Sequence, residues 1–163
     1  MLRLCNILLF ILILVFIMNV EQKEKIIKNR PEEVLAMTLY GEARGAPYKA
    51  KLGMARVMMN RVKDGRFGSS IEDVVTKPKQ FSCYNDGDPN LDEILIVADD
   101  FEKAFDINIY LRDCYNAAMT VLSGKDDTPV KESLYYHTDK VNPKWNKKLK
   151  LEAKIGNTLF WKE

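Results

Sequence analysis

The N-terminal twenty residues constrain this chain more strongly than any other segment. Residues 4–20 read LCNILLFILILVFIMNV and are almost entirely apolar, which is typical of an export signal or a short membrane span. No small-x-small cleavage pattern precedes the charged stretch EQKEKIIKNR that follows. The sequence therefore predicts an uncleaved signal anchor over residues 1–20, with a removed signal peptide as the alternative.

The rest of the chain has the size and composition of one soluble domain. We expect the charged residues 21–30 to form a linker, and residues 31–163 are enough for one domain with its own core. Because 29% of all residues are charged and the apolar leader holds almost none of them, this part is expected to be globular. A net charge of only +2 gives no reason to expect a nucleic-acid partner.

Cysteine and histidine do not have the spacing of a metal site. The chain has three cysteines and one histidine, His137, so we expect no bound metal. Cys5 lies in the apolar leader, which leaves Cys83 and Cys114 in the folded part. They either pair as a disulfide, which an extracytoplasmic location permits, or remain two buried thiols.

Hydrophobic periodicity predicts a mainly helical, α+β fold. One helix is expected from Pro31 to near Arg44, and after a glycine-bearing corner a second runs from Pro47 to about Val62. A short helix follows a capping box at Ser70 and leads into the turn-rich loop KQFSCYNDGDPN. The longest helix, expected to cross the core and end at Gly124, is predicted from apolar residues at helical spacing: Ile107, Leu111, Cys114, Ala118 and Val121.

The C-terminal part has the pattern of short strands. SLYYH reads as an extended segment, and LEAKIGNTLFW reads as a β-hairpin around Gly156 and Asn157. We therefore expect a small C-terminal β-hairpin beside the helices.

Glu42 continues the apolar stripe of the first predicted helix, because Leu35, Leu39 and Glu42 stand at positions i, i+4 and i+7. Partial burial and the negative end of a helix both favour the protonated form of a carboxyl group. A protonated carboxyl is what cleavage of a glycosidic bond requires, because the sugar oxygen leaves poorly without a proton. Spacing alone equally fits a solvated glutamate or one paired with Arg44.

The stretch LAMTLYGEARGAPYKAKLGMARVMMNRVKDGRF resembles the opening of the cell-wall hydrolase family that includes the spore cortex-lytic enzymes. Further matches follow in the family's order: QFS at residues 80–82, YYH at 135–137, VNPKW at 141–145 and IGNTLFW at 155–161. The resemblance covers residues from about 34 to 161, and its Y-G-E-A-R-G core is the specific part.

This resemblance implies a small lysozyme-like helical domain that cuts peptidoglycan between N-acetylmuramic acid and N-acetylglucosamine, without a cofactor. Members of the family are thought to act as lytic transglycosylases, in which Glu42 protonates the leaving oxygen and then takes a proton from the muramic acid's own 6-hydroxyl. Ordinary muramidase hydrolysis is the alternative and needs a second carboxylate. Asp86 and Asp88 are its candidates, although both also fit turn chemistry.

The resemblance also suggests which residues hold the substrate. Gln80 and Ser82 are expected to bind sugar N-acetyl or hydroxyl groups, and Tyr136 to stack on a sugar ring or orient Glu42. We expect His137 either to contact the substrate or to have a purely structural role. Four other motif residues have plainer expectations: Phe81 is a core anchor, Trp145 is a sugar platform or packing, and Asn60 and Arg61 brace the Glu42 corner.

Two other classes of protein fit parts of the sequence. A cysteine peptidase would pair Cys83 or Cys114 with His137, but neither cysteine begins a helix, where its pKa would fall. A membrane-tethered module that binds peptidoglycan without cutting it is the second alternative.

Location and partners follow from the expected substrate. We expect an extracytoplasmic monomer, of cellular or phage (endolysin) origin, anchored in the inner membrane and facing the periplasm or cell wall, or secreted if the leader is cut. Residues 140–154 carry six lysines against one acid, Glu152, which suits a solvated face or an anionic polymer or membrane surface.

Overall fold

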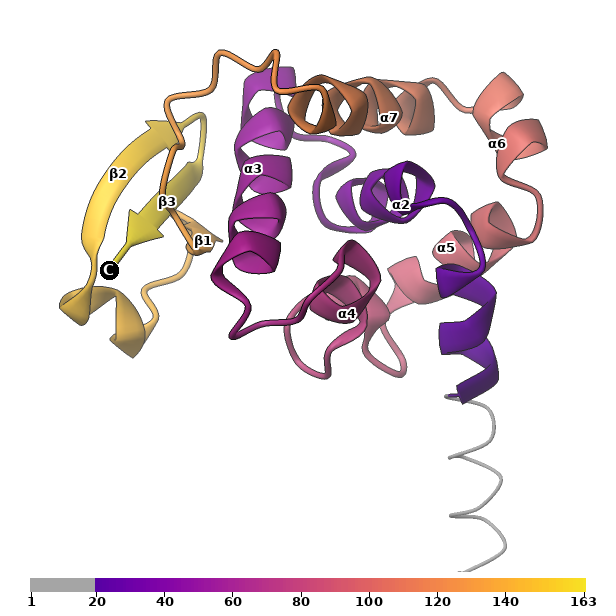
Figure 1. Ribbon diagram of the computed structural model, residues 1–163, viewed down its shortest axis with the longest axis horizontal. Helices are drawn as coiled ribbons and strands as arrows, with labels where there is room; N and C mark the ends of the chain where they lie inside the picture. The colour runs from indigo at the N-terminus through magenta and orange to yellow at the C-terminus, as the bar shows by residue number, and fades with distance from the viewer. Residues whose placement is uncertain (1–19) are drawn as a thin grey trace, which may run out of the picture.

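The computed structural model describes residues 20–163 as a mainly helical body with a small sheet at one side (Figure 1). The helices are α2 (Pro31–Ala43), α3 (Tyr48–Asp64), α4 (Ile71–Thr76), α5 (Pro89–Asp99), α6 (Phe101–Ile107) and α7 (Ile109–Leu122), and the 3-10 turns are η1 (Ser82–Tyr84) and η2 (Lys144–Lys148). The strands are β1 (Tyr135–Thr138), β2 (Lys150–Ile155) and β3 (Thr158–Lys162).

Helix α2 is the central element of the body. Residues 33–40 are all buried, and α2 contacts α3, α4, α5 and α7, which surround it in Figure 1. Such a helix is mostly apolar, and its two buried polar side chains are paired: Glu33 with Arg30, and Thr38 with the carbonyl of Val34. The predicted stripe on Leu35 and Leu39 is therefore only part of the face that α2 buries.

The two predicted helices around the corner, and the short helix after them, are confirmed. Gly65 ends α3 with φ at +79° and donates its N–H to the carbonyl of Arg61, a left-handed cap that glycine adopts without strain. Ser70 begins α4 by accepting a hydrogen bond of 3.1 Å from the backbone nitrogen of Asp73.

The later helices differ from the prediction. Within residues 31–163 the longest helix is α3 with 17 residues, whereas α7 has 14, and it is α2 that occupies the centre. Ile107 was predicted on the buried stripe but is 79% exposed, because Asn108 caps a new helix at Ile109. Helices α5 and α6 were not predicted, since their short apolar stripes are interrupted by acidic residues.

The predicted hairpin of β2 and β3 is present, but it belongs to an antiparallel sheet of three strands in the order β1-β3-β2. Tyr136 pairs with Phe160 and so shares its side of the sheet. Phe160 is fully buried against α3, where a Cβ atom at Gly53 would lie 2.7 Å from its ring. A glycine at this position lets the sheet approach α3 closely.

The segment predicted as a charged linker is helical over residues 20–27. Ile26 is 3% exposed and joins the core, Lys25 pairs with Asp99 at 2.5 Å, and the Asn29 amide donates to the carbonyl of Ala98 at 3.2 Å. Residues 1–19 of the predicted anchor lie outside the described part. Within residues 20–163, no helix has both the length and the apolar character to cross a membrane.

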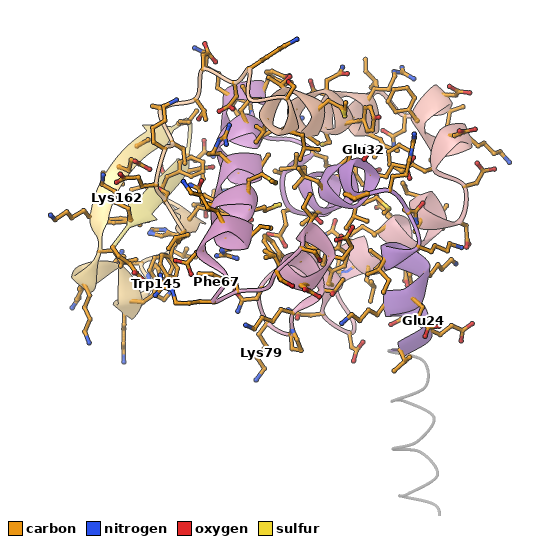
Figure 2. All side chains as sticks on the ribbon, in the orientation of Figure 1. Glu24, Glu32, Phe67, Lys79, Trp145 and Lys162 are labelled. Atoms are coloured by element: carbon orange, nitrogen blue, oxygen red, sulfur yellow. The ribbon has the colours of Figure 1, made fainter. Side chains whose placement is uncertain are left out.

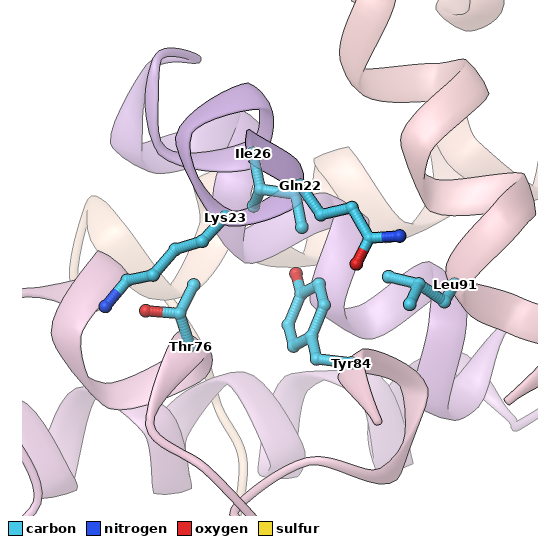
Figure 3. Close-up of a pocket in the computed structure, with 6 residues that line it drawn as sticks. All are labelled: Gln22, Lys23, Ile26, Thr76, Tyr84 and Leu91. Atoms are coloured by element: carbon cyan, nitrogen blue, oxygen red, sulfur yellow. The ribbon is translucent and has the colours of Figure 1, made fainter. Parts of the chain in front are cut away.

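A small hollow of about 40 Å³ lies where this N-terminal helix meets the body (Figure 3). Tyr84 stands in it, and its hydroxyl shares a hydrogen bond of 2.8 Å with Thr38 Oγ1. The lining contains none of the predicted site residues: it consists of Gln22, Lys23, Ile26, Thr76, Tyr84 and Leu91. The hollow therefore belongs to the junction and not to the candidate site.

Candidate active site

Glu42 lies in the last turn of α2, and its carboxylate is held by η1. The backbone N–H of Cys83 donates to Glu42 Oε1 at 2.9 Å, and Ser82 Oγ donates to the same oxygen at 3.1 Å. The side chain is partly buried. Its orientation is therefore fixed by two donors from a segment 40 positions away in the sequence.

Gly41 makes this contact possible. A Cβ atom at this position would lie 2.6 Å from Cδ1 of Ile94 and 2.7 Å from Cβ of Cys83. Non-bonded carbon atoms do not approach each other this closely, so only glycine at position 41 lets η1 pack directly on α2. The glycine of the Y-G-E-A-R-G motif thus places the Cys83 N–H next to the carboxylate that follows it.

Arg61 of α3 brings a buried positive charge close to Glu42. Its Nε donates to the carbonyl of Leu134 at 2.8 Å, and its Nη1 lies 3.5 Å from Gln80 Oε1. Burial lowers the pKa of Arg61, whereas interactions with Tyr136, Tyr135 and Glu42 raise it. A guanidinium group keeps its proton in proteins, so this charge is permanent.

Tyr136 reaches the same cluster from β1. Burial raises its pKa well above the ordinary tyrosine value, and the negative charge of Glu42 raises it further, whereas Arg61 opposes the shift. The phenol therefore stays neutral and keeps its proton as a hydrogen-bond donor beside Glu42.

The structure brings together Glu42, Gln80, Ser82 and Tyr136, but not His137. Successive residues of a strand point to opposite faces, so His137 lies on the other side of β1 from Tyr136. Its ring stacks on Trp161 at 5.7 Å, and its Nδ1 lies 2.8 Å from the carbonyl of Thr138. The substrate role suggested for His137 therefore has no place in the Glu42 cluster.

The other polar residues of the motif have structural partners. Arg44 pairs with Glu93 at 2.8 Å, so it is not the partner of Glu42 that the sequence allowed. The Tyr40 hydroxyl donates to Glu93 at 3.2 Å and accepts from the amide of Asn108 at 2.9 Å. These contacts fix the end of α2 against α5 and the start of α7.

The two candidate second carboxylates lie in the loop between η1 and α5. Asp88 caps α5 by accepting from the backbone nitrogen of Asn90 at 2.9 Å, which is the turn role that the sequence allowed. Asp86 is exposed. Asp88 thus has a structural task of its own.

Cys83 and Cys114 are free, buried thiols and form no disulfide. Burial raises the pKa of both, that of Cys114 to about 12. A cysteine nucleophile needs the opposite shift, so neither thiol suits peptidase chemistry.

Sequence reasoning missed two contributors to this site. Arg61 was expected only to brace the corner, yet its guanidinium lies over the rings of Phe67 and Phe81 and reaches Gln80. Asn60 beside it holds the carbonyls of Lys131 and Ser133. The second contributor is the backbone N–H of Cys83, which every residue except proline has, so the residue type does not reveal it.

Phe81 is 2% exposed, which confirms it as a core anchor.

Comparison with known proteins gives one consistent family. Residues 45–161 match the Cell Wall Hydrolase family, so the matched region begins three positions after Glu42. The spore cortex-lytic enzyme of Bacillus cereus is 28% identical over 131 residues, which are 80% of this chain and 43% of that protein. That of Bacillus subtilis is 37% identical over 59 residues, 36% of this chain and 19% of that protein.

Two solved structures are similar as well. The catalytic domain of the Bacillus cereus SleB protein superposes with a TM-score of 0.60 at 27% identity, covering 81% of this chain and 89% of that domain. The catalytic domain of the germination-specific lytic transglycosylase SleB from Bacillus anthracis gives 0.58 at 25% identity, covering 81% and 93%. This chain thus spans less than half of the Bacillus cereus relative but most of the solved domains.

Proposed function

This chain belongs to the Cell Wall Hydrolase family, and we propose that it cleaves peptidoglycan glycan strands as a lytic transglycosylase with Glu42 as acid and base. The cut bond joins N-acetylmuramic acid to N-acetylglucosamine. The observation that supports this most is the pair of donors from Ser82 and Cys83 on one oxygen of the Glu42 carboxyl group.

The two donors decide which oxygen carries the catalytic proton. In a protonated carboxyl group, the carbonyl oxygen accepts hydrogen bonds and the other oxygen donates one. Because both donors meet Oε1, the transferable proton lies on Oε2. Oε2 then protonates the leaving glycosidic oxygen while the bond from that oxygen to the muramic acid C1 breaks.

The carboxylate left behind next acts as a base. It takes the proton of the muramic acid 6-hydroxyl while that oxygen bonds to C1, which gives a 1,6-anhydro end and regenerates the acid. The fixed charge of Arg61 stabilises the intervening carboxylate, and the Cys83 and Ser82 donors hold it in place. Gln80, Ser82 and Tyr136 remain as the side chains that contact the sugar. One carboxyl group is enough for this cycle.

We also propose an extracytoplasmic location with the N-terminal residues 1–20 in the membrane, facing the periplasm or wall, because the substrate lies there. The chain is then an anchored monomer whose reach is limited to the wall next to the membrane.

Digestion of purified sacculi tests the proposal. The full chain in mild detergent is compared with Glu42→Gln, and Glu102→Gln serves as the control, because Glu102 is an exposed carboxylate of α6 outside the Glu42 cluster. Mass spectrometry should find muropeptides with anhydro ends from the wild type and from the control, and none from Glu42→Gln.

Other products would change the assignment. Reducing muramic ends indicate hydrolysis with a second carboxylate, free stem peptides indicate an amidase or peptidase, and no release indicates a binding module. Undiminished release by Glu42→Gln removes the catalytic role of Glu42.

A further inference from the structure

The outer face of the small sheet carries a continuous series of aromatic rings. We call it the aromatic face. Neighbouring ring centroids lie 5.4 to 6.0 Å apart, from Phe67 to Tyr135, on to Trp145, then His137 and finally Trp161. Trp145 is 41% exposed, and Figure 2 shows it with Phe67 beside the sheet. None of these rings has a part in the reaction proposed for Glu42.

Strand register places this face away from α3. Tyr136 and Phe160 pair on the inner side, whereas Tyr135 pairs with Trp161 on the outer side. Trp145 belongs to η2, and its ring meets that of His137 edge-on, with the ring centroids 5.4 Å apart. The face is therefore built from four separate segments: the loop after α3, β1, η2 and β3.

The aromatic face begins where the Glu42 cluster ends. The guanidinium group of Arg61 lies 4.9 Å from the ring of Phe67 and 5.3 Å from that of Phe81, which immediately precedes Ser82. On β1, Tyr136 of the cluster stands between two residues of the face. Because Tyr136 faces the inner side of the sheet and Tyr135 and His137 face the outer side, the aromatic face is a surface separate from the Glu42 cluster, and the two adjoin at Arg61 and Phe67.

Positive charge lies beside Trp145 of the aromatic face, whereas at Tyr135 the face also meets the carboxylate of Glu163, which accepts from the Tyr135 hydroxyl at 3.2 Å and pairs with Arg66 at 2.9 Å. Glu152, the one acid of the lysine-rich run, turns to the backbone N–H groups of residues 131–133. Lys154 pairs with Asp139 at 3.1 Å. The exposed lysines of η2 and the start of β2 are Lys144, Lys147, Lys148 and Lys150. A ligand that suits this surface has rings that can stack on the aromatic side chains, and it also carries negative charges.

We propose that the aromatic face is a second saccharide site, which holds a glycan strand with anionic stem peptides at a distance from the bond that is cut. Pyranose rings offer an apolar C–H side to an aromatic ring and keep their hydroxyl groups in water. The carboxylates of the stem peptides complement the lysines. The choice of peptidoglycan as ligand rests on the proposed function.

Tryptophan fluorescence measures this binding directly, because both tryptophans of the chain lie in the aromatic face. The full chain carrying Glu42→Gln is kept in a detergent without a sugar head group and titrated with soluble glycan strands that keep their stem peptides. We expect a saturable change in emission. Adding Trp145→Ala should weaken binding ~10-fold, as for an exposed aromatic anchor, with Trp161 as the remaining reporter.

Two further variants make the result specific. Tyr110→Ala removes an aromatic ring that is 57% exposed on α7 and should leave the dissociation constant unchanged. Trp145→Phe keeps a ring that can stack, so it should fold and bind with a dissociation constant within ~3-fold of that of the parent.

Removing the stem peptides from the strands should weaken binding at low salt and make no difference at high salt, because salt screens the lysines.

Unchanged affinity of Trp145→Ala, or emission that does not move on saturation, would overturn the proposal. So would an emission change with anionic phospholipid vesicles but none with glycan strands, which would make this a membrane-binding face. The titration measures binding and not cleavage. A failure of the proposed catalytic role would appear separately, as muropeptide release by the Glu42→Gln parent.

Discussion

The backbone N–H of Cys83 donates a 2.9 Å hydrogen bond to Oε1 of Glu42, across 41 positions of sequence. A backbone donor cannot be removed by changing a side chain, but it can be displaced by changing what lies beneath it. Gly41 is the residue beneath it, so the relationship between Glu42 and Cys83 is best tested through this glycine.

Gly41→Ala should destabilise the protein by about 2 kcal/mol, because the new methyl group overlaps Ile94 and Cys83. Glycan cleavage should fall as well, since η1 has to move away from α2. Gly45→Ala is the matched control in the same motif, because a Cβ atom there meets nothing within 4 Å. Urea unfolding of both variants measures the difference. Equal free energies of unfolding for the two variants would mean that η1 can move away from α2 without loss of stability.

Ser82→Ala should slow glycan cleavage roughly 2- to 10-fold, which is the effect of losing one hydrogen bond while the Cys83 donor remains. The melting temperature should stay the same, because Ser82 is exposed. Initial rates of muropeptide release measure the effect, with Ser123→Ala, an exposed serine after α7, as control. A rate equal to the wild type contradicts the assigned contact.

Tyr136→Phe keeps the ring that packs on Phe160 and removes only the hydroxyl group. Cleavage should fall about 10-fold, as expected for a hydrogen bond to a charged group. Since burial and the charge of Glu42 hold the pKa of Tyr136 well above its ordinary value, the phenol does not ionise near neutral pH. The loss should therefore be the same at every pH from 5 to about 9. A loss that grows or disappears over this range would show that Tyr136 titrates.

Native protein should react slowly with iodoacetamide at Cys83 and Cys114, because the thiolate is the reactive form and burial raises both pKa values. Both thiols should be alkylated once the protein is unfolded without reductant, which peptide mass spectrometry can show. Recovery of a peptide that links the two residues would contradict the free thiols. Rapid loss of glycan cleavage during treatment of the native protein would revive a cysteine nucleophile.

Glu152→Gln should reduce stability by about 1 kcal/mol at neutral pH, because its carboxylate accepts hydrogen bonds from the segment that leads into β1. Burial by itself would raise the pKa of Glu152, but donors from Ser133, Glu132 and Lys131 outweigh it and lower the pKa. A lowered pKa in the folded state means stability that is complete above the unfolded value of about 4.3 and is lost as the pH falls through the folded value.

The stability gap between wild type and Glu152→Gln should therefore be constant from pH 6 to 8 and shrink below about pH 4. Denaturant unfolding across this range measures it. A gap that widens in acid would show that the carboxylate is destabilising in the folded protein.

Local sequence signals were enough for much of the helical framework. The start of α2, the end of α3 and the start of α4 follow from Pro31, Gly65 and Ser70. Proline needs no hydrogen-bond partner at a first helical position, glycine adopts the left-handed cap, and the serine side chain accepts from a free backbone N–H. Helices α5 and α6 were missed because each is short and acidic. The extended segment at β1 was predicted, but its pairing with β3 was not, because the paired residues are 20 to 26 positions apart in the sequence.

The sequence by itself determined that a glutamate lies near the end of a helix, in a stretch that resembles the opening of cell-wall hydrolases, because caps, periodicity and motif order are local properties. Only the tertiary structure decided that Ser82, Arg61 and Tyr136 meet at Glu42 while His137 turns to the opposite face. That outcome depends on how closely η1 and the sheet approach the helices, which Gly41 and Gly53 permit. Such approaches are set by packing between distant segments, and no local pattern encodes them.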